Sequence, residues 1–440
     1  MLGGVAELLT SSPYVGYTYS YPHKTTHRPL EPPRPLRQVW STEDRDSLFL
    51  YVHVPYCEMR CGFCNLFTTT GVDETAVGEY LDALARQAAV VDEQLGPATI
   101  ARMAIGGGTP TLLTPAQLEV LLCSVVSRFG AHPSRVPTSV ETSPQTATPE
   151  RLAVLASSGV ERVSIGVQSF DDVEVHALGR PQRETDVEAA LRTIRDASIP
   201  ILNIDLMYGG QGQTPASFCD SIRRALAWSP EELYLYPLYV RKLTGLARRA
   251  RQWDDERLHA YRVGRDLLLA HGYRQVSMRM FRRGELGVAE PTGYRCQDDG
   301  MVGLGCGARS YTRALHYSWP YSVGRPSIRQ TIDAYVRRAD DAYALADYGV
   351  VLSEDDQRRR FVLLSLLQTI GLDLQEYRAR FGASALAHMP PLQELLDVGL
   401  AVEVDGFVRL TDVGLERSDA IGPWLYSSEV RAQMDGFAWM

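Results

Sequence analysis

The stretch Leu48-Phe-Leu-Tyr-Val-His-Val-Pro-Tyr-Cys57-Glu-Met-Arg-Cys61-Gly-Phe-Cys64 joins a run of β-forming residues to three closely spaced cysteines. Residues 48–54 predict a buried strand because they are almost all apolar, aromatic or β-branched. Residues 75–94, which follow the cysteines, show the apolar spacing of an amphipathic helix. A strand, a loop that carries reactive side chains and a helix together make the first unit of an α/β fold.

The same alternation repeats to about residue 282. Further strands are expected at 101–106, 137–141, 162–167, 201–206, 233–238 and 274–280, with helices at 115–127, 184–197, 215–227 and 256–271. Repeated units of this kind form a parallel sheet with helices outside, because each crossover between parallel strands is long and right-handed. Six or seven units favour an open or partial (β/α)6-type barrel over a doubly wound sheet, although periodicity alone does not decide between them.

Two segments flank this barrel. The first 40 or so residues are rich in Pro and Tyr, which predicts an extended arm; a disordered tail is the alternative, but such tails usually lack tyrosines. Near the C-terminus, helices are expected at 354–367, 373–380 and 392–396, and Asp405-Gly406 between two apolar runs predicts a hairpin. Helices followed by a hairpin are typical of a winged-helix-like module. We therefore expect an arm (1–45), a barrel (46–325) and a C-terminal lid domain (326–440).

Composition excludes several classes of protein. Of the 440 residues 45% are apolar and 22% charged, which is typical of a globular protein. The net charge is −8, and residues 391–400, the candidate reading helix of the C-terminal module, contain no Lys or Arg, so we expect no nucleic-acid partner. No apolar run reaches the roughly 20 residues of a membrane span, and the first ten residues do not form a secretory signal. We expect a cytoplasmic monomer that binds no membrane.

The cysteines indicate a metal centre. There are seven, an odd number and too few for a disulfide scaffold. Cys57, Cys61 and Cys64 form a Cys-x3-Cys-x2-Cys pattern that matches three corners of a [4Fe–4S] cluster and leaves one iron open for chemistry. The alternative, a structural zinc, needs a fourth ligand such as His53.

Polar residues gather at the carboxyl ends of the expected strands. Glu141, Gln168 and Asp205 end the third, fourth and fifth strands, and Tyr239 and Arg241 follow the sixth. The loop Gly106-Gly-Gly-Thr-Pro-Thr111 follows the second strand, where glycines let the backbone approach a ligand closely. In barrels of parallel strands this end carries the active site.

The cysteine pattern, with Phe63 before the third cysteine, resembles that of the radical S-adenosylmethionine (radical SAM) superfamily. The resemblance implies a [4Fe–4S] cluster on Cys57, Cys61 and Cys64. The open iron would chelate SAM, and an electron from a reductant such as flavodoxin or ferredoxin would yield a 5′-deoxyadenosyl radical that acts on a small-molecule substrate.

Within the superfamily, an ordered set of motifs resembles the family of oxygen-independent coproporphyrinogen III oxidase. The motifs are Tyr51-x-His53-x-Pro55, Glu141-Thr-Ser-Pro, Gly166-Val-Gln-Ser-Phe170, Leu178-Gly-Arg180, Asp205-Leu-Met-Tyr-Gly and Gly303-Leu-Gly-Cys-Gly-Ala308. The resemblance implies two SAM molecules. The contacts of the first SAM would be Tyr51, Gly107, Glu141 and the backbone near Arg309. Those of the second would be Phe63, Gly108, Thr109, Gln168, Arg180, Asp205 and the backbone near Leu238.

Two of these residues have simpler explanations. Arg180 suits a carboxylate as a bidentate partner, but it would also suit a surface ion pair with Glu184 or Asp186. Asp205 suits a ribose diol, but it would also suit a helix cap.

One departure separates the chain from the decarboxylating oxidases. They carry a further cysteine two residues after the third, where this chain has Leu66. The chain resembles more closely the relatives called class C radical SAM methyltransferases and cyclopropanases. We therefore expect transfer of a methyl or methylene group to an sp2 carbon of an unsaturated or aromatic natural product. The alternatives are decarboxylation of a porphyrinogen and a haem chaperone with an axial ligand such as His316.

Candidate residues can be named for each catalytic task. We place catalytic roles on Tyr51, Gln168 and Tyr239. Three groups of side chains are further candidates: Tyr234, Tyr236 and Tyr239 to stack on a flat substrate; Arg241, Arg279, Arg282 and Arg309 to hold an acidic group; His176, Tyr239 and Tyr311 to accept a proton.

Overall fold

The computed structural model describes residues 4–248, 256–284 and 296–439. Its main feature is a sheet of thirteen strands in the order β1-β13-β12-β11-β10-β2-β3-β4-β5-β6-β7-β9-β8. The strands are β1 (Arg28–Pro35), β2 (Leu48–Val54), β3 (Ile100–Gly107), β4 (Thr138–Thr142), β5 (Arg162–Gln168), β6 (Ile201–Tyr208), β7 (Glu232–Pro237), β8 (Tyr273–Gln275), β9 (Met280–Arg283), β10 (Met301–Leu304), β11 (Arg309–Tyr311), β12 (Leu315–Ser318) and β13 (Leu345–Val351).

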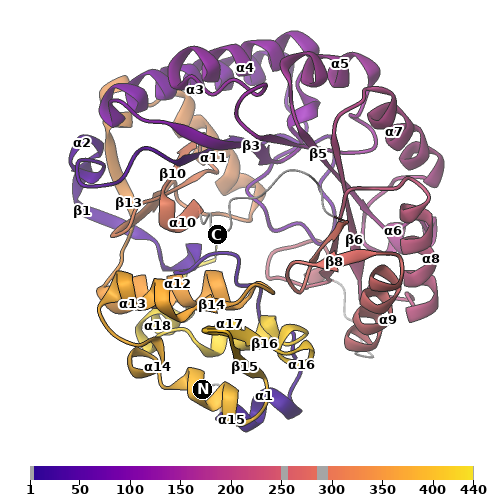
Figure 1. Ribbon diagram of the computed structural model, residues 1–440. Coiled ribbons are helices and arrows are strands. Elements are labelled where there is room, and N and C mark those ends of the chain that lie inside the picture. Colours follow the sequence, from indigo (N-terminus) through magenta and orange to yellow (C-terminus); the bar gives the residue numbers. More distant parts are fainter. Residues whose placement is uncertain (1–3, 249–255, 285–295, 440) are drawn as a thin grey trace.

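Strands β2 to β7 run parallel and form the expected partial barrel. The sheet curves with its helices on the outside, and its end strands β1 and β8 are not neighbours, so the barrel stays open (Figure 1). The barrel helices are α3 (Glu74–Leu95), α4 (Pro115–Phe129), α5 (Pro149–Ser158), α6 (Asp172–Ala177), α7 (Glu184–Asp196), α8 (Pro215–Leu226) and α9 (Arg257–Ala270). The α/β fold class and the (β/α)6 architecture are confirmed; α5 and α6 were not predicted.

The seventh expected strand is different. Residues 274–280 do not continue the parallel series but split between β8 and β9, which pair antiparallel. The chain reverses at Ser277, whose hydroxyl accepts hydrogen bonds from the backbone N–H groups of Arg279 and Met280. A single side-chain acceptor thus turns an apparently continuous β run into a tight hairpin.

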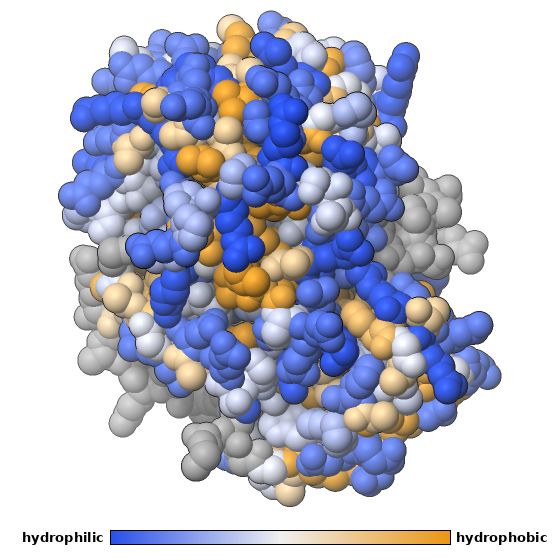
Figure 2. Space-filling model, turned by 90° about the vertical axis from the view of Figure 1, so that its left-hand side faces the viewer, coloured by the Kyte–Doolittle hydropathy of each residue, from blue (hydrophilic) through white to orange (hydrophobic). Residues whose placement is uncertain are grey.

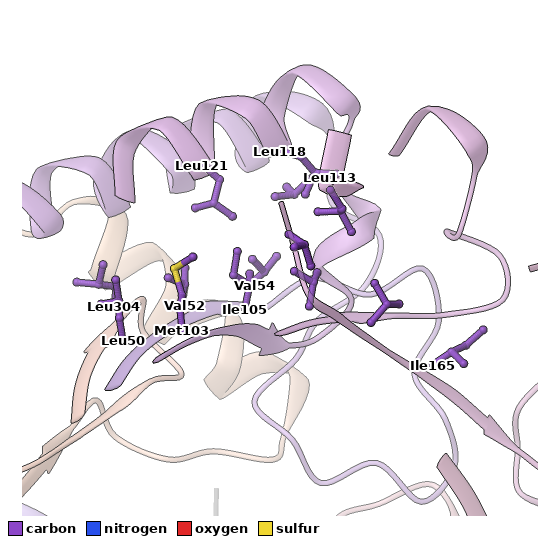
Figure 3. Close-up of a cluster of buried hydrophobic side chains, with 14 of the residues drawn as sticks. Leu50, Val52, Val54, Met103, Ile105, Leu113, Leu118, Leu121, Ile165 and Leu304 are labelled. Atoms are coloured by element: carbon purple, nitrogen blue, oxygen red, sulfur yellow. The ribbon is translucent and has the colours of Figure 1, made fainter. Parts of the chain in front are cut away.

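The core lies between the sheet and the outer helices. Leu50, Val52 and Val54 of β2 are at most 1% exposed; with Met103 and Ile105 of β3 they point toward Leu118 and Leu121 of α4 (Figure 3). Because side chains alternate along a strand, Tyr51 and His53 point to the inside of the barrel. The alternation therefore assigns apolar residues to the helix side and polar residues to the barrel interior.

The C-terminal module has its own core and a small sheet in the order β14-β16-β15. Its elements are α12 (Glu354–Leu366), β14 (Leu372–Asp373), α13 (Leu374–Phe381), α14 (Ala385–His388), α15 (Pro391–Asp397), β15 (Ala401–Val404), β16 (Phe407–Leu410), α16 (Asp412–Leu415), α17 (Ser418–Trp424) and α18 (Ser428–Asp435). The predicted hairpin is present: Asp405 and Gly406 have φ of 52° and 80°, the two positive values that a type I′ turn requires.

The arm is ordered, unlike a disordered tail. It contains α1 (Val5–Thr10), the 3-10 turn η1 (Lys24–Thr26) and β1, which pairs with β13, and α2 (Leu36–Val39) follows it. It passes between the barrel and the C-terminal module, where Tyr21 is fully buried and its hydroxyl donates to Asp356 at 2.9 Å (Figure 1). The many tyrosines of the arm therefore serve as packing residues between two domains.

The large sheet extends beyond the boundary expected at residue 326. After α10 (Cys296–Asp299) and β10 to β12, α11 (Arg325–Val336) packs against α3 of the barrel, and β13 joins the sheet between β1 and β12.

The described residues contain no helix long and apolar enough to cross a bilayer. The side of the molecule shown in Figure 2 is mostly hydrophilic, with apolar side chains in small groups.

Candidate active site

The three clustered cysteines lie on the loop between β2 and α3. All are free and half-buried: Cys57, Cys61 and Cys64. The loop is held at its base, where the Thr69 N–H donates to Pro55 O at 2.8 Å, and at its tip, where the Gly62 N–H donates to Leu178 O at 3.1 Å. A Cβ at Gly62 would lie only 2.7 Å from Leu178 O, which is too close for any side chain. Only glycine therefore fits at this position between Cys61 and Cys64. The loop is thus packed to a fixed shape at both ends.

The donor set fits an iron–sulfur cluster better than zinc. A single zinc ion needs its ligands about 2.1–2.3 Å from one point, and within the described residues no three Cys, His, Asp or Glu side chains converge in that way. In a cubane each thiolate binds its own iron, so the sulfur atoms stand further apart. His53 is also occupied, because its Nε2 lies 2.9 Å from Phe67 O. Three soft sulfur donors and no fourth ligand suit the cluster that the sequence predicts.

Neighbouring groups act on the thiols. Burial raises the pKa of the Cys57 thiol to about 12, so a bound metal is needed to hold it as a thiolate. The guanidinium of Arg180 donates from one nitrogen to Cys61 Sγ at 3.0 Å and from another to Gly166 O at 2.8 Å. Hydrogen bonds to cluster sulfurs are one of the means by which a protein adjusts a cluster's reduction potential.

Arg180 is therefore not part of a surface ion pair. It is 7% exposed, and its remaining donor, Nε, binds the Gln182 side chain at 2.5 Å. Glu184 instead pairs with Arg224, and Asp186 caps α7 through the backbone N–H of Arg183.

Glu141, at the end of β4, lies against the glycine loop. Its Oε2 accepts the N–H of Gly107 at 3.0 Å, and a Cβ at Gly106 would meet the carboxylate carbon at 2.8 Å. Glu141 remains accessible to solvent although it lies on the inner side of the sheet, and we call the space that it borders inside the barrel the chamber. Burial, and secondarily the charge of Asp205, raise the pKa of Glu141 to about 7.

Asp205 lies two strands away on β6. It is half-buried and accepts one hydrogen bond, from Asn203 Nδ2 at 2.7 Å, so it caps no helix. Burial raises its pKa to about 6. Asp205 is the register partner of Gly166 on β5. Because Gly166 has no side chain, it does not separate Asp205 from the chamber. We call Glu141 and Asp205 the acidic wall.

The remaining residues predicted to bind SAM surround this wall. Gln168, at the end of β5, has a φ of 71°, a strained value for a residue other than glycine that is common at functional sites. Tyr51 Oη lies 3.4 Å from His53 Nδ1. The backbone N–H groups of Gly108, Thr109 and Leu238 donate to Val54 O, Tyr56 O and Tyr208 O at 2.7, 2.7 and 2.8 Å. Phe63 packs on Leu178, Met207, Leu238 and Leu246.

Aromatic side chains line the same chamber. On β7, Leu233 and Leu235 are fully buried on the helix side, whereas Tyr234 and Tyr236 face the barrel interior and are only half-buried. Their rings are stacked, with centroids 5.7 Å apart and planes 17° apart. Inward side chains that stay partly accessible show that the barrel interior is not filled by packing. A flat ligand could stack on such a pair.

A second wall of the chamber is basic, and one of its three members was not predicted. We define the basic wall as Lys24 of the arm, Arg309 of β11 and Arg241, which follows β7. Arg309 donates only to phenols: Nε to Tyr311 Oη at 2.7 Å and NH1 to Tyr19 Oη at 3.4 Å. The sequence did not predict Lys24 as a site residue, because a lysine in a Pro- and Tyr-rich arm is expected to be exposed to solvent.

The other two candidate arginines are occupied by ion pairs. Arg279 pairs with Asp419 of α17, which is 1% exposed and also accepts the Tyr239 hydroxyl at 2.5 Å. Arg282 pairs with Glu232 at 2.7 Å, at the amino end of β7 and away from the strand ends that form the site. The expectation that these two arginines hold an acidic group is therefore corrected. The sequence did not predict Asp419 as a partner of Arg279 and Tyr239, because Asp419 belongs to the C-terminal domain and no sequence pattern places that domain against the barrel.

The candidate proton acceptors and the candidate haem ligand are placed as follows. The Tyr239 hydroxyl donates to Asp419, and burial raises its pKa far above neutrality, which makes it a poor base. Tyr311 is buried under Arg309, and His176 is exposed on α6. His316 is fully buried with its Nε2 2.9 Å from Arg360, so it does not offer that nitrogen to haem.

Comparison with known proteins identifies the family of the chain. Residues 51–225 match the family model of the radical SAM superfamily, and residues 352–416 match that of the HemN C-terminal domain. The chain is 30% identical over 387 residues to the oxygen-independent coproporphyrinogen III oxidase of Cereibacter sphaeroides, covering 84% of this chain and 83% of the relative. It is 27% identical over 371 residues to the heme chaperone HemW of Bacillus subtilis, covering 83% and 95%.

The fold is shared with a solved structure. Coproporphyrinogen III oxidase from Escherichia coli superposes with a TM-score of 0.77 over 96% of this chain and 99% of the other, at 22% identity. These relatives are oxidases and a chaperone, so they support the family and not its methyltransferase or cyclopropanase branch. By sequence, fold and cysteine loop, the chain belongs to the oxygen-independent coproporphyrinogen III oxidase-like family of the radical SAM superfamily.

Proposed function

We propose that this protein binds two SAM molecules in one chamber and uses the radical from the first to move a one-carbon unit from the second to an sp2 carbon of its substrate. The observation that carries the two-SAM proposal is the acidic wall. Within the described residues, neither Glu141 nor Asp205 forms an ion pair, and the charge of Asp205 adds to the cost of ionising Glu141. Two sulfonium cations would supply the missing opposite charges.

The residues divide the work as follows. A cluster bound to Cys57, Cys61 and Cys64 would supply the electron that cleaves SAM to a 5′-deoxyadenosyl radical. Glu141 and the Gly107 N–H mark a polar site for the first SAM. Gln168 lies on β5 and Asp205 on β6, one and two strands away from Glu141 on β4. A second SAM bound by these two residues would place its methyl group in the same chamber. Tyr234 and Tyr236 would hold a flat substrate across from them.

The choice of reaction rests on a smaller observation. Leu66, 48% exposed on the cysteine loop, stands where the decarboxylating oxidases of this family carry a further cysteine. We therefore place methyl or methylene transfer first: the one-carbon unit bonds to the substrate carbon, the reductant supplies one further electron to the resulting radical, and the bond from that carbon unit to sulfur breaks to release S-adenosylhomocysteine. The named relatives favour the second candidate, oxidative decarboxylation, in which the substrate loses a hydrogen atom, CO2 and one electron to an acceptor.

SAM with a deuterated methyl group tests the proposal in the anaerobically reconstituted protein. Carbon transfer predicts deuterium in 5′-deoxyadenosine together with S-adenosylhomocysteine. Unlabelled 5′-deoxyadenosine with CO2 and no S-adenosylhomocysteine would establish decarboxylation. The Cys61→Ala variant is the control, and it should lose the absorbance near 400 nm of iron–thiolate ligation as well as all SAM cleavage; retained iron and sulfide would sink the cluster assignment.

The heme chaperone is a third candidate because one relative carries that name. Stoichiometric haem binding without SAM turnover would favour it. The complete burial of His316 speaks against this residue as the ligand.

A further inference from the structure

Lys24 is a buried amine for which the described residues supply no hydrogen-bond acceptor. The residue is 8% exposed, and its ammonium nitrogen lies 3.6 Å from the centroid of the Tyr321 ring and 5.9 Å from that of Tyr19. Among the described residues, no carboxylate pairs with it and no oxygen accepts a hydrogen bond from it. The chain contains 45 basic residues but only two lysines, Lys24 and Lys242, so lysine in this buried place is unusual for its composition.

The charged groups around Lys24 add to the imbalance. Burial lowers the pKa of Lys24 well below its usual range, and the charges of Arg309 and Arg241 add to that effect, while the Cys64 thiol opposes it. The same two arginines also lower the pKa of His23, next to Lys24. Lys24, Arg309 and Arg241 come from three separate segments, and no carboxylate stands among the main charges that act on Lys24 and His23. A buried cation is normally paired, so this arrangement predicts an anionic ligand.

The basic wall opens on the chamber that contains the cysteine loop. The Tyr321 hydroxyl, under the Lys24 ammonium, donates to the backbone oxygen of Asn65 at 2.6 Å, one residue from Cys64. The Tyr19 ring lies 5.1 Å from the Arg309 guanidinium. The guanidinium of Arg241 lies 4.4 Å from the centroid of the Tyr239 ring, whose hydroxyl binds Asp419. An anion held here would lie among aromatic rings.

We propose that Lys24, Arg309 and Arg241 form a binding site for the carboxylate of a flat organic substrate. Within the described residues, Arg309 gives hydrogen bonds only to phenols, and the side chains of Lys24 and Arg241 give none, so all three are available to a carboxylate. The rings of Tyr19 and Tyr321 can contact the body of the ligand. The proposal rests on the proposed function only in that the substrate enters this chamber; it holds for carbon transfer and for decarboxylation alike. SAM also carries a carboxylate, so the test must separate the two sources.

The scarcity of lysine provides a readout that does not depend on activity. Protein labelled with [ε-13C]lysine and reconstituted with its cluster should give two lysine signals in a 1H–13C NMR spectrum, and Lys242→Gln assigns them. With SAM already saturating, we expect 2-naphthoate, a flat carboxylate probe, to shift the Lys24 signal and leave that of Lys242 in place. The neutral analogue 2-naphthamide should shift neither.

Variants supply the second arm. Lys24→Gln should weaken 2-naphthoate binding about tenfold, the size of one lost charge-assisted hydrogen bond. Lys24→Arg should restore most of the affinity, and Lys242→Gln, which removes the same charge from an exposed position, should leave it unchanged. The SAM affinity of Lys24→Gln should equal that of the wild type.

Two outcomes would overturn the proposal. In the first, the Lys24 signal shifts when SAM is added but does not shift with 5′-methylthioadenosine, which lacks the carboxylate. If 2-naphthoate then causes no further shift, the three cations bind the carboxylate of SAM. In the second, the signal responds to no carboxylate, and Lys24 then compensates only the charge of the cluster. Carbon transfer could fail its own deuterium test while the naphthoate shift remains, so the two proposals fail separately.

Discussion

The acidic and basic walls of the chamber differ in how they are built. Glu141 lies next to the end of β4, and Asp205 lies three residues before the end of β6; the parallel register and the alternation of side chains place both on the same face of the sheet. Lys24, Arg241 and Arg309 come from the arm, a loop and a short antiparallel strand, and they meet only because the arm passes between two domains. The sheet thus supplies the acidic wall, whereas the arm, together with segments beyond the parallel strands, supplies the basic wall.

Within the described residues, the charges of both walls form no ion pair, which costs folding free energy in the empty protein. Other buried charges do form ion pairs, as in Arg279 with Asp419 and Arg360 with Asp298. Opposite walls of unpaired charge are the arrangement expected where cationic ligands and an anionic ligand must lie side by side. The comparison therefore separates charges retained for structure from charges retained for ligands.

Removing a paired carboxylate should have the largest effect on stability. Asp419→Ala leaves Arg279 buried without a counter-charge, and we expect it to lower the free energy of unfolding by about 3–5 kcal/mol. Glu141→Gln, which removes an unpaired carboxylate, should leave the stability of SAM-free protein unchanged or raise it. Denaturant titration of the cluster-free protein measures both, and equal losses in the two variants would remove the distinction between structural and ligand-binding charges.

Within the acidic wall, the two carboxylates should separate by function. Glu141→Gln should reduce every turnover, including the cleavage of SAM that occurs without substrate, whereas Asp205→Asn should spare much of that cleavage and lose transfer. Each lost charge-assisted hydrogen bond corresponds to about 1.5–3 kcal/mol, or roughly ten- to hundredfold in affinity for the SAM concerned. The ratio of 5′-deoxyadenosine to product distinguishes them; if both variants lose the two activities in equal proportion, the two-SAM assignment is wrong.

The acidic wall should also make SAM binding depend on pH. A cationic ligand favours the ionised carboxylate, and the free Glu141 has a pKa of about 7, so SAM binding below that pH must first displace a proton. Affinity should therefore rise with pH, by about tenfold between pH 6 and pH 8. Glu141→Gln is the control that removes this carboxylate but retains the titration of SAM itself, and it should show a flatter dependence. Equal slopes would contradict the assignment.

The residues of the acidic wall could be predicted from the sequence better than those of the basic wall. The strands β2 to β7 and the positions of Glu141, Gln168 and Asp205 could be predicted, because strand ends of a parallel sheet converge wherever the pattern is regular. The hairpin of β8 and β9 could not, because its turn depends on hydrogen bonds that the Ser277 hydroxyl accepts from the backbone N–H groups of Arg279 and Met280. A periodic pattern contains no information on such a local contact.

The basic wall and Asp419 lay beyond sequence reasoning for a different reason. Their partners are hundreds of residues away: Tyr239 with Asp419, and Lys24 with Tyr321. His316 shows the converse, since it reads as a free ligand in the sequence but its Nε2 is occupied by Arg360 in the core. Pairings of this kind depend on how the arm and the C-terminal module dock, which no local pattern encodes.

We expect the smallest effect on ligand affinity from a change to Tyr19, a neutral residue that contacts the basic wall. The Tyr19 hydroxyl accepts a long hydrogen bond, 3.4 Å, from Arg309, while the Tyr19 ring lies within 6 Å of both Lys24 and Arg309. Tyr19→Phe removes the oxygen and retains the ring, so 2-naphthoate affinity should fall only about two- to fivefold. Tyr17→Phe is the matched control, because the Tyr17 ring stacks on Arg279, whose charge is already paired with Asp419.

Calorimetric titration of both variants with 2-naphthoate, in the presence of SAM, distinguishes the possibilities. Tyr17→Phe should bind like the wild type. A loss in Tyr19→Phe as large as that in Lys24→Gln would mean that the phenol, and not the cations, binds the carboxylate. Equal losses in the two tyrosine variants would mean that aromatic contact alone holds the ligand. Either result would leave the chamber with one functional charged wall, formed by Glu141 and Asp205, since the cations opposite would then contribute nothing to binding.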